Sequence, residues 1–279
     1  MTFTACYHSR LYLYRNIPAA GRPAGDASAE RRFFIMKIFV LNLPRATERL
    51  RTMRERLTAL GLEAEVLPAV EGARLDRARL PAGTEPGLSS GELGCYLSHV
   101  RFWETVVEQG LPAAIILEDD VLLDPALLEV ARAALALDYP VDAVRLSALR
   151  PVRGITLGAL PGGRRLVLPN KNPSGTQGYL VTQAGARRLL ATLPVPRAPI
   201  DTTLDAYWKH DLYVPVVTPA VVEEDSTIAS SIQGRFGSGR RKPLVRHLAQ
   251  VTEAQRRKLR VFLLARRLQR RSRAADQAK

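Results

Sequence analysis

The segment Ala113–Asp120 joins an apolar run to three consecutive carboxylates, Glu118, Asp119 and Asp120. The apolar part is typical of a strand that is buried on both faces of a parallel sheet. In open α/β sheets, ligands bind at the carboxyl ends of such strands. Three adjacent carboxylates repel one another there unless a cation is bound, and oxygen-rich sites suit hard divalent ions such as Mg²⁺ or Mn²⁺. A solvated acidic turn is the alternative that the triplet alone leaves open.

The elements around this triplet alternate between strand and helix patterns. Helical spacing of apolar residues predicts helices near residues 47–60, 89–109, 125–136 and 184–193, with another beginning at residue 200. Strands are expected at 37–41, 64–67, 113–117, 143–146, 165–168 and 178–182, with extended segments at 212–217 and 220–222. This alternation predicts an α/β fold with a mostly parallel central sheet.

The chain has 279 residues, and we expect three parts. Residues 1–35 lack sustained periodicity, and Met36 opens directly onto the first strand, so this segment is expected to be a gene-model extension or a disordered arm. Residues 36–234 are expected to form one domain and residues 235–279 a basic tail. The first residues lack the apolar core of a signal peptide, and two cysteines make no disulfide framework, so a cytoplasmic location is the default expectation.

The formal net charge of +14 is concentrated in the tail. Residues 235–279 hold 15 Lys or Arg and two acids, which gives +13 and leaves +1 for residues 1–234. Leu248, Val251, Leu259, Phe262 and Leu263 interrupt these cations in a helical pattern, and a basic helix with an apolar face is typical of contact with an anionic membrane surface. The tail has few aromatic residues for stacking, which disfavours nucleic acid as a partner. A solvated, disordered tail is the alternative.

Four segments together resemble glycosyltransferase family 25, the bacterial lipooligosaccharide galactosyltransferase group. They are Ile38–Arg45 followed by Glu48-Arg49, then Glu92–His99, Ile115–Val121, and Gly175–Leu180 leading to Asp201. The resemblance covers about residues 36–232. It implies a GT-A-like fold, which is a single nucleotide-sugar-binding domain, and a metal-dependent transfer of a hexose with inversion.

For this chain the resemblance implies galactose from UDP-galactose as the transferred sugar, Mn²⁺ or Mg²⁺ as the cofactor, and a lipooligosaccharide or lipid-linked glycan as the acceptor. Such acceptors are assembled at the cytoplasmic face of the inner membrane, so a peripheral location there is expected. Two alternatives stay open. One is a non-enzymatic protein that binds membrane or nucleic acid, and the other is a metal-dependent hydrolase of nucleotide sugars.

A divalent ion clamped to both phosphates would neutralise the charge that develops on the leaving diphosphate. Asp120 is expected to be its direct ligand, with Glu118 and Asp119 acting through water or on the sugar or ribose. Asp225 is a further candidate ligand, or part of an acidic surface loop. Residues expected to contact the nucleotide sugar are Asn42, Arg45, Arg49, Glu71, Thr176 and Gln177, although a solvated helix face also explains Arg49 and a plain turn explains Glu71.

Inversion needs a base that takes the proton of the acceptor hydroxyl. Asp201 is the leading candidate, followed by Asp205 and Glu92. Asp201 is equally well explained as a helix cap, and Glu92 has capping-box spacing from Ser89. His99 and Cys95 are expected to be structural, since a lone helical histidine or cysteine is more often packed than reactive.

Overall fold

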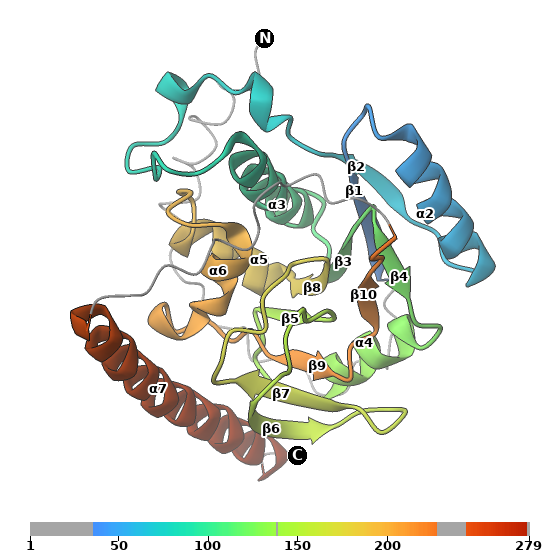
Figure 1. Cartoon of the computed structure of the whole chain (residues 1–279). Helices are drawn as coiled ribbons and strands as arrows, with labels where there is room; N and C mark the ends of the chain where they lie inside the picture. Colours follow the sequence, from blue (N-terminus) through green and yellow to red (C-terminus); the bar gives the residue numbers. More distant parts are fainter. Residues whose placement is uncertain (1–35, 138, 228–243, 278–279) are drawn as a thin grey trace.

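The computed structural model describes residues 36–137, 139–227 and 244–277 (Figure 1). The expectation for residues 1–35 lies outside these residues, and so does the domain boundary expected near residue 234. Among the described helices, none is both long and apolar enough to cross a bilayer.

An eight-stranded sheet runs through the domain in the order β2-β1-β3-β8-β5-β9-β7-β6. β8 and β7 run opposite to the other six strands, so the sheet is mixed but mostly parallel, as the sequence predicts. The strands are β1 (Lys37–Asn42), β2 (Glu65–Pro68), β3 (Ala113–Glu118), β5 (Ala143–Arg145), β6 (Gly154–Ala159), β7 (Arg165–Pro169), β8 (Gly178–Thr182) and β9 (Val216–Thr218).

Helices cover both faces of this sheet (Figure 1). α3 (Ser90–Glu108), α5 (Gln183–Thr192) and α6 (Ile200–Asp205) lie on one side, and α2 (Thr47–Ala59) and α4 (Leu127–Ala136) lie on the other. The 3-10 turns η1 (Gly72–Arg74) and η2 (Arg77–Arg79) form part of the long connection between β2 and α3, and η3 (Tyr207–Lys209) follows α6. This three-layer arrangement is the α/β fold predicted from the alternation of elements.

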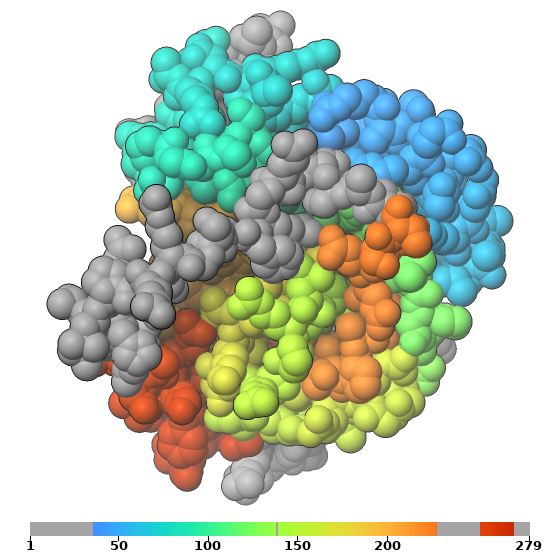
Figure 2. Space-filling model, in the orientation of Figure 1, coloured from blue at the N-terminus to red at the C-terminus, as the bar shows by residue number. Residues whose placement is uncertain are grey.

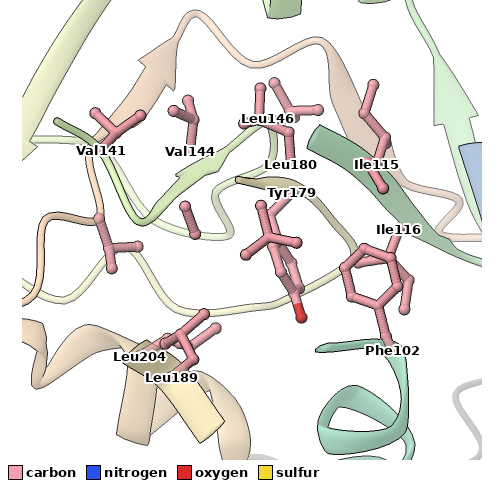
Figure 3. Packing of buried hydrophobic residues seen from close by; sticks show 14 of the residues in the cluster. Phe102, Ile115, Ile116, Val141, Val144, Leu146, Tyr179, Leu180, Leu189 and Leu204 are labelled. Atoms are coloured by element: carbon pink, nitrogen blue, oxygen red, sulfur yellow. The ribbon is translucent and has the colours of Figure 1, made fainter. Parts of the chain in front are cut away.

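β3 is the centre of the core, because its apolar run is covered on both faces. Ala114, Ile115, Ile116 and Leu117 are each 1% exposed or less. Tyr179 of β8 packs edge-on against Phe102 of α3 with ring centroids 5.8 Å apart (Figure 3). The strand is therefore held rigidly up to Glu118, where the apolar run ends and the carboxylates begin.

A two-stranded ladder connects the acidic triplet to a distant part of the chain. β4 (Val121–Leu123) pairs antiparallel with β10 (Val222–Glu224), and Val121 lies opposite Glu224. Figure 2 shows the β10 segment, in orange, alongside the green segment that carries β4. The register places Asp225 next to Asp120, and the Asp225 backbone N–H donates to the Asp120 carbonyl oxygen over 3.0 Å.

The tail forms the long helix α7 (Leu244–Gln277), which lies along β6, β7 and η3 (Figure 1). Among residues 252–270, whose side chains are described, the packed face consists of Val261, Leu264, Ala265 and Leu268. Of the predicted apolar residues, Leu259, Phe262 and Leu263 lie away from that face and are 61%, 45% and 43% exposed, and the side chains of Leu248 and Val251 lie outside the described ones. The tail is therefore a helix docked on the domain, with a second apolar stripe that the domain does not cover.

Candidate active site

A cavity of about 260 Å³ opens where β1, β2 and β3 end, beside the N-terminal half of α3. Five of the predicted site residues line it, namely Arg45, Arg49, Glu118, Asp119 and Asp120. Ser90 and Gly91 from the first turn of α3 also line it, together with Cys95 and Ser98. The carboxyl ends of neighbouring parallel strands thus form the ligand-sized hollow that open α/β sheets use.

The carboxylates of the triplet are held by residues that follow β1. Asn42 donates its side-chain N–H to Asp119 Oδ2 over 2.5 Å and a second one to the Ala46 carbonyl over 3.0 Å. The Arg49 guanidinium lies 3.3 Å from Asp119 Oδ1 and 3.4 Å from Asp120 Oδ2. Arg49 therefore does not lie on a solvated helix face, which was the alternative for this residue. Its guanidinium bridges two carboxylates that would otherwise repel each other.

The two aspartates differ in how far the protein satisfies them. Burial raises the pKa of Asp119, although Arg49 and the Asn42 hydrogen bond oppose that shift. Asp120 Oδ1 is buried and has no hydrogen-bond partner among the described residues. A buried carboxylate oxygen without a partner is costly unless a cation or a donor reaches it. The carboxylate oxygens of Asp119 and Asp120 therefore fit as ligands of a hard divalent cation.

Glu71, at the start of η1, is held between two arginines at the rim of the cavity. One of its carboxylate oxygens lies 3.7 Å from Arg45 and 2.8 Å from Arg74. Arg45 and Arg74 are largely exposed, so these ion pairs are weak and can open for a ligand.

Asp225, the further candidate ligand, lies beside the triplet, and its side chain already has partners. It forms an ion pair with Arg56 and accepts hydrogen bonds from the Thr227 backbone and hydroxyl. The hydrogen bonds from Thr227, with Arg56 adding to them, lower the pKa of Asp225 to about 2. Arg56 also donates to the Val121 carbonyl over 2.8 Å, so Asp225 and Arg56 together hold the segment that follows Asp120.

The loop before β8 reaches the triplet from the other side. The Glu118 backbone N–H donates to the Gln177 carbonyl over 2.8 Å, and the Thr176 hydroxyl lies 3.4 Å from Glu118 Oε1. The Gln177 side chain is buried, and its amide has no hydrogen-bond partner among the described residues. Thr176 and Gln177 therefore lie next to Glu118 but do not line the cavity itself.

Residues 35–149, which include the ends of β1, β2 and β3 and the triplet, match the sequence model of glycosyltransferase family 25 (LPS biosynthesis protein). This segment belongs to glycosyltransferase family 25.

The chain is 31% identical over 195 residues to a glycosyltransferase 25 family member of Drosophila pseudoobscura pseudoobscura, which covers 60% of the chain and 29% of that protein. It is 29% identical over 200 residues to procollagen galactosyltransferase 1-B of Xenopus laevis, covering 63% of the chain and 32% of that protein. A Mus musculus relative, named inactive glycosyltransferase 25 family member 3, is 30% identical over 193 residues. The match covers 60% of this chain and 31% of that protein. The chain thus spans less than a third of each of these relatives.

A solved glycosyltransferase that takes part in glycosylating the major capsid of PBCV-1 has 11% sequence identity and a TM-score of 0.35. The structural match covers 70% of this chain and 94% of the chain of that glycosyltransferase.

Of the three carboxylates expected as bases in this family 25 domain, two have clear structural roles. Glu92 accepts hydrogen bonds from the Ser89 backbone and hydroxyl, both over 2.8 Å, and so completes a capping box on α3. Asp205 is buried in an ion pair with Arg145 and accepts the Ser174 N–H over 3.1 Å. Glu92 is therefore explained by its helix-capping hydrogen bonds and Asp205 by its ion pair.

Asp201 lies in the first turn of α6, whose N-cap is Pro199, so the side chain is no N-cap. One of its oxygens accepts the Thr202 N–H over 2.6 Å, and the other lies 3.5 Å from the Gly175 nitrogen. Asp201 thus faces the loop that carries Thr176 and Gln177, and its assignment as the base stays a prediction.

Sequence reasoning does not identify the residues that hold this loop. The buried Arg145 of β5 pairs with Asp205 and donates to the Ser174 carbonyl over 2.6 Å. Ser174 has a positive φ of 56° and Gly175 one of 77°, a conformation that costs a residue with a side chain. A short strand containing an arginine between apolar residues is the signal that could have identified Arg145, since a buried arginine needs a partner.

Proposed function

We propose that this domain is an inverting glycosyltransferase that transfers a hexose from a nucleotide sugar, with UDP-galactose as the first donor to test. The supporting observation is that Asp120, whose buried Oδ1 has no hydrogen-bond partner among the described residues, lines the same cavity as Arg45 and Arg49. A cavity that offers carboxylates for a cation and guanidinium groups for phosphates suits a metal-bound diphosphate. The proposal extends to this chain what family membership suggests, and one relative named inactive makes a direct assay necessary.

Asp119 and Asp120 would hold Mn²⁺ or Mg²⁺, with Glu118 near by. When bound, such an ion would neutralise charge on the leaving diphosphate. Arg49 already bridges Asp119 and Asp120, and its guanidinium can turn to a phosphate when the carboxylates bind a cation instead. Ser90 and Gly91 bring the N-terminus of α3 to the cavity, and a helix N-terminus favours an anionic ligand.

The acceptor would approach from the loop Ser174–Gln177. Asp201 is the proposed base, because its carboxylate contacts that loop and, unlike Asp205, is not held in a buried ion pair. A single displacement requires the base on the side of the sugar opposite to the diphosphate, and this loop contacts Glu118 without lining the cavity that Arg45 and Arg49 line.

The acceptor is proposed to be a glycan carried on a lipid, as in lipooligosaccharide, which α7 would bring within reach. Leu259, Phe262 and Leu263 form an exposed apolar stripe, and Lys258, Arg266 and Arg270 belong to the cations around it. Arg266 stacks 4.9 Å above the Phe262 ring, so this stripe combines apolar and cationic groups. Such a surface suits the headgroup region of an anionic membrane, and the domain would be peripheral to it.

The experiment is a donor screen that measures release of the nucleoside diphosphate, with and without Mn²⁺ and with and without a lipid-linked acceptor. A transferase releases UDP only when metal and acceptor are both present. Release without an acceptor would favour a nucleotide-sugar hydrolase. If no sugar nucleotide is consumed and none binds, the domain is a binding protein rather than an enzyme.

A further inference from the structure

A second group of possible metal ligands lies at the cavity, and two of its three members, Cys95 and His99, have no role in the proposed transfer. Cys95 and His99 are one turn apart on α3, and Glu118 ends β3. Cys95 Sγ, a ring nitrogen of His99 and a carboxylate oxygen of Glu118 all lie within 4.8 Å of one another. Residues four apart share one face of a helix, so α3 presents a thiol and an imidazole to the same point.

This group is accessible from the cavity but closed on the protein side. Cys95 and Glu118 are half-buried and line the cavity, whereas His99 has no exposed surface. An ion that enters the cavity therefore meets the thiol and the carboxylate first, and the imidazole lies behind them.

The histidine is held as a metal-binding histidine usually is, by a hydrogen bond at one ring nitrogen. His99 Nδ1 lies 3.0 Å from the Tyr179 hydroxyl, and Trp103 Nε1 donates a hydrogen bond to that hydroxyl over 2.9 Å. His99 Nε2 is buried and has no hydrogen-bond partner among the described residues. A buried polar nitrogen without a partner calls for an explanation, and a bound ion provides one.

We propose that Cys95, His99 and Glu118 form a second cation site, for a soft divalent ion such as Zn²⁺. Thiolate and imidazole ligands favour zinc over the hard ions that suit Asp119 and Asp120. Three protein ligands leave a fourth coordination position open to the cavity, as in zinc sites that bind a further ligand. The two sites meet at Glu118, so zinc bound here would occupy part of the same hollow.

The test uses the full chain, freed of metal and titrated with Co²⁺, whose bond to a thiolate gives a charge-transfer absorption band. We expect one equivalent of Co²⁺ to produce this band and Zn²⁺ to remove it. Cys95→Ser should abolish the band and weaken Zn²⁺ binding at least about tenfold, since losing even an outer partner of a ligand costs about 10–100-fold.

The chain offers matched controls for this experiment. Cys6 is the other cysteine in the sequence, and Cys6→Ser should leave the band unchanged. Asp120→Asn, in the proposed hard-cation site, should also keep it. The proposal is overturned if the native chain gives no band, or if the band survives Cys95→Ser in a protein with unchanged circular dichroism. None of these measurements needs a sugar nucleotide, so their failure leaves the proposed transferase activity standing, and the reverse also holds.

Discussion

Asn42 and Asp119 are 77 residues apart in the sequence, and the Asn42 side-chain amide donates to Asp119 Oδ2 over 2.5 Å. Both side chains are buried, Asn42 at 3% exposure and Asp119 at 5%. This hydrogen bond ties the end of β1 to the end of β3, and it sets the orientation of the first aspartate of the pair. Arg49 completes the arrangement by bridging Asp119 and Asp120.

The first prediction concerns this bond. Asn42→Ala leaves a buried carboxylate without its neutral donor, and we expect it to lower the free energy of unfolding by about 1–3 kcal/mol, measured in urea. A double-mutant cycle with Asp119→Asn is the control. The bond has no such role if Asn42→Ala costs as much in the Asp119→Asn background as in the native chain.

A second prediction follows from Asp120 Oδ1, which has no hydrogen-bond partner within the described part of the chain. Asp120→Asn keeps the size of the side chain but removes its charge, so cation binding should weaken and transfer should fall by at least about 10²-fold, a loss typical for removal of one group that stabilises developing charge. Glu223→Gln changes an exposed carboxylate on the neighbouring strand β10 and should leave transfer unchanged. Equal activity of the two variants would contradict the assignment.

The pKa of Asp119, raised by burial, predicts a pH dependence of Mn²⁺ binding. Only the ionised carboxylate attracts the cation, so affinity should fall as the pH is lowered through this raised pKa. The fall should therefore begin at a higher pH than for an exposed aspartate, whose pKa is about 3.9. Calorimetric titration of Mn²⁺ at several pH values measures it, and a profile that Asp119→Asn does not alter would contradict this origin.

Features of this site that depend on neighbouring residues in the sequence could be predicted, and features that depend on contacts between distant segments could not. The apolar run of β3 and the Ser89–Glu92 capping box are local patterns, and the structure confirms both. The contact between Asn42 and Asp119, and the bridge made by Arg49 71 residues from Asp120, depend on strand order, which no local pattern encodes.

Sequence reasoning missed the strands β4 and β6, and it could not assign the two faces of the helix expected in the tail. β4 has three residues and pairs with β10 about a hundred residues away, so neither strand has a visible period. In α7, two apolar stripes lie on opposite sides of the helix. Composition alone could not separate the stripe with Val261 and Leu264, which packs on the domain, from the stripe with Phe262, which does not.

A fourth prediction concerns the buried ion pair of Arg145 and Asp205. Asp205→Asn leaves the arginine buried without its counter-charge, and we expect a loss of about 3–5 kcal/mol in the free energy of unfolding. The exposed pair Arg51–Glu55 on α2 is the control, where Glu55→Gln should cost no more than about 1 kcal/mol. If the two variants lose similar amounts of free energy of unfolding, the buried pair Arg145–Asp205 stabilises the protein no more than an exposed pair does. It then does not hold the Ser174–Gln177 loop.

The last prediction separates the two stripes of α7. Phe262→Ser with Leu263→Ser removes apolar surface that the domain does not cover, so the fold should be unchanged while binding to vesicles of anionic lipid weakens. The loss should exceed tenfold, since burying one such side chain contributes about 1.5–3 kcal/mol and a factor of ten corresponds to about 1.4 kcal/mol.

The matched control for this pair is Leu122→Ser on β4, because Leu122 and Phe262 are both 45% exposed and only Phe262 belongs to α7. Co-sedimentation with anionic vesicles, at several salt concentrations, measures the binding, and neutral vesicles should bind less because the cations around the stripe then lack a counter-charge. Binding that Leu122→Ser reduces as much as the α7 variant, or that does not depend on lipid charge, would exclude the stripe as the membrane contact.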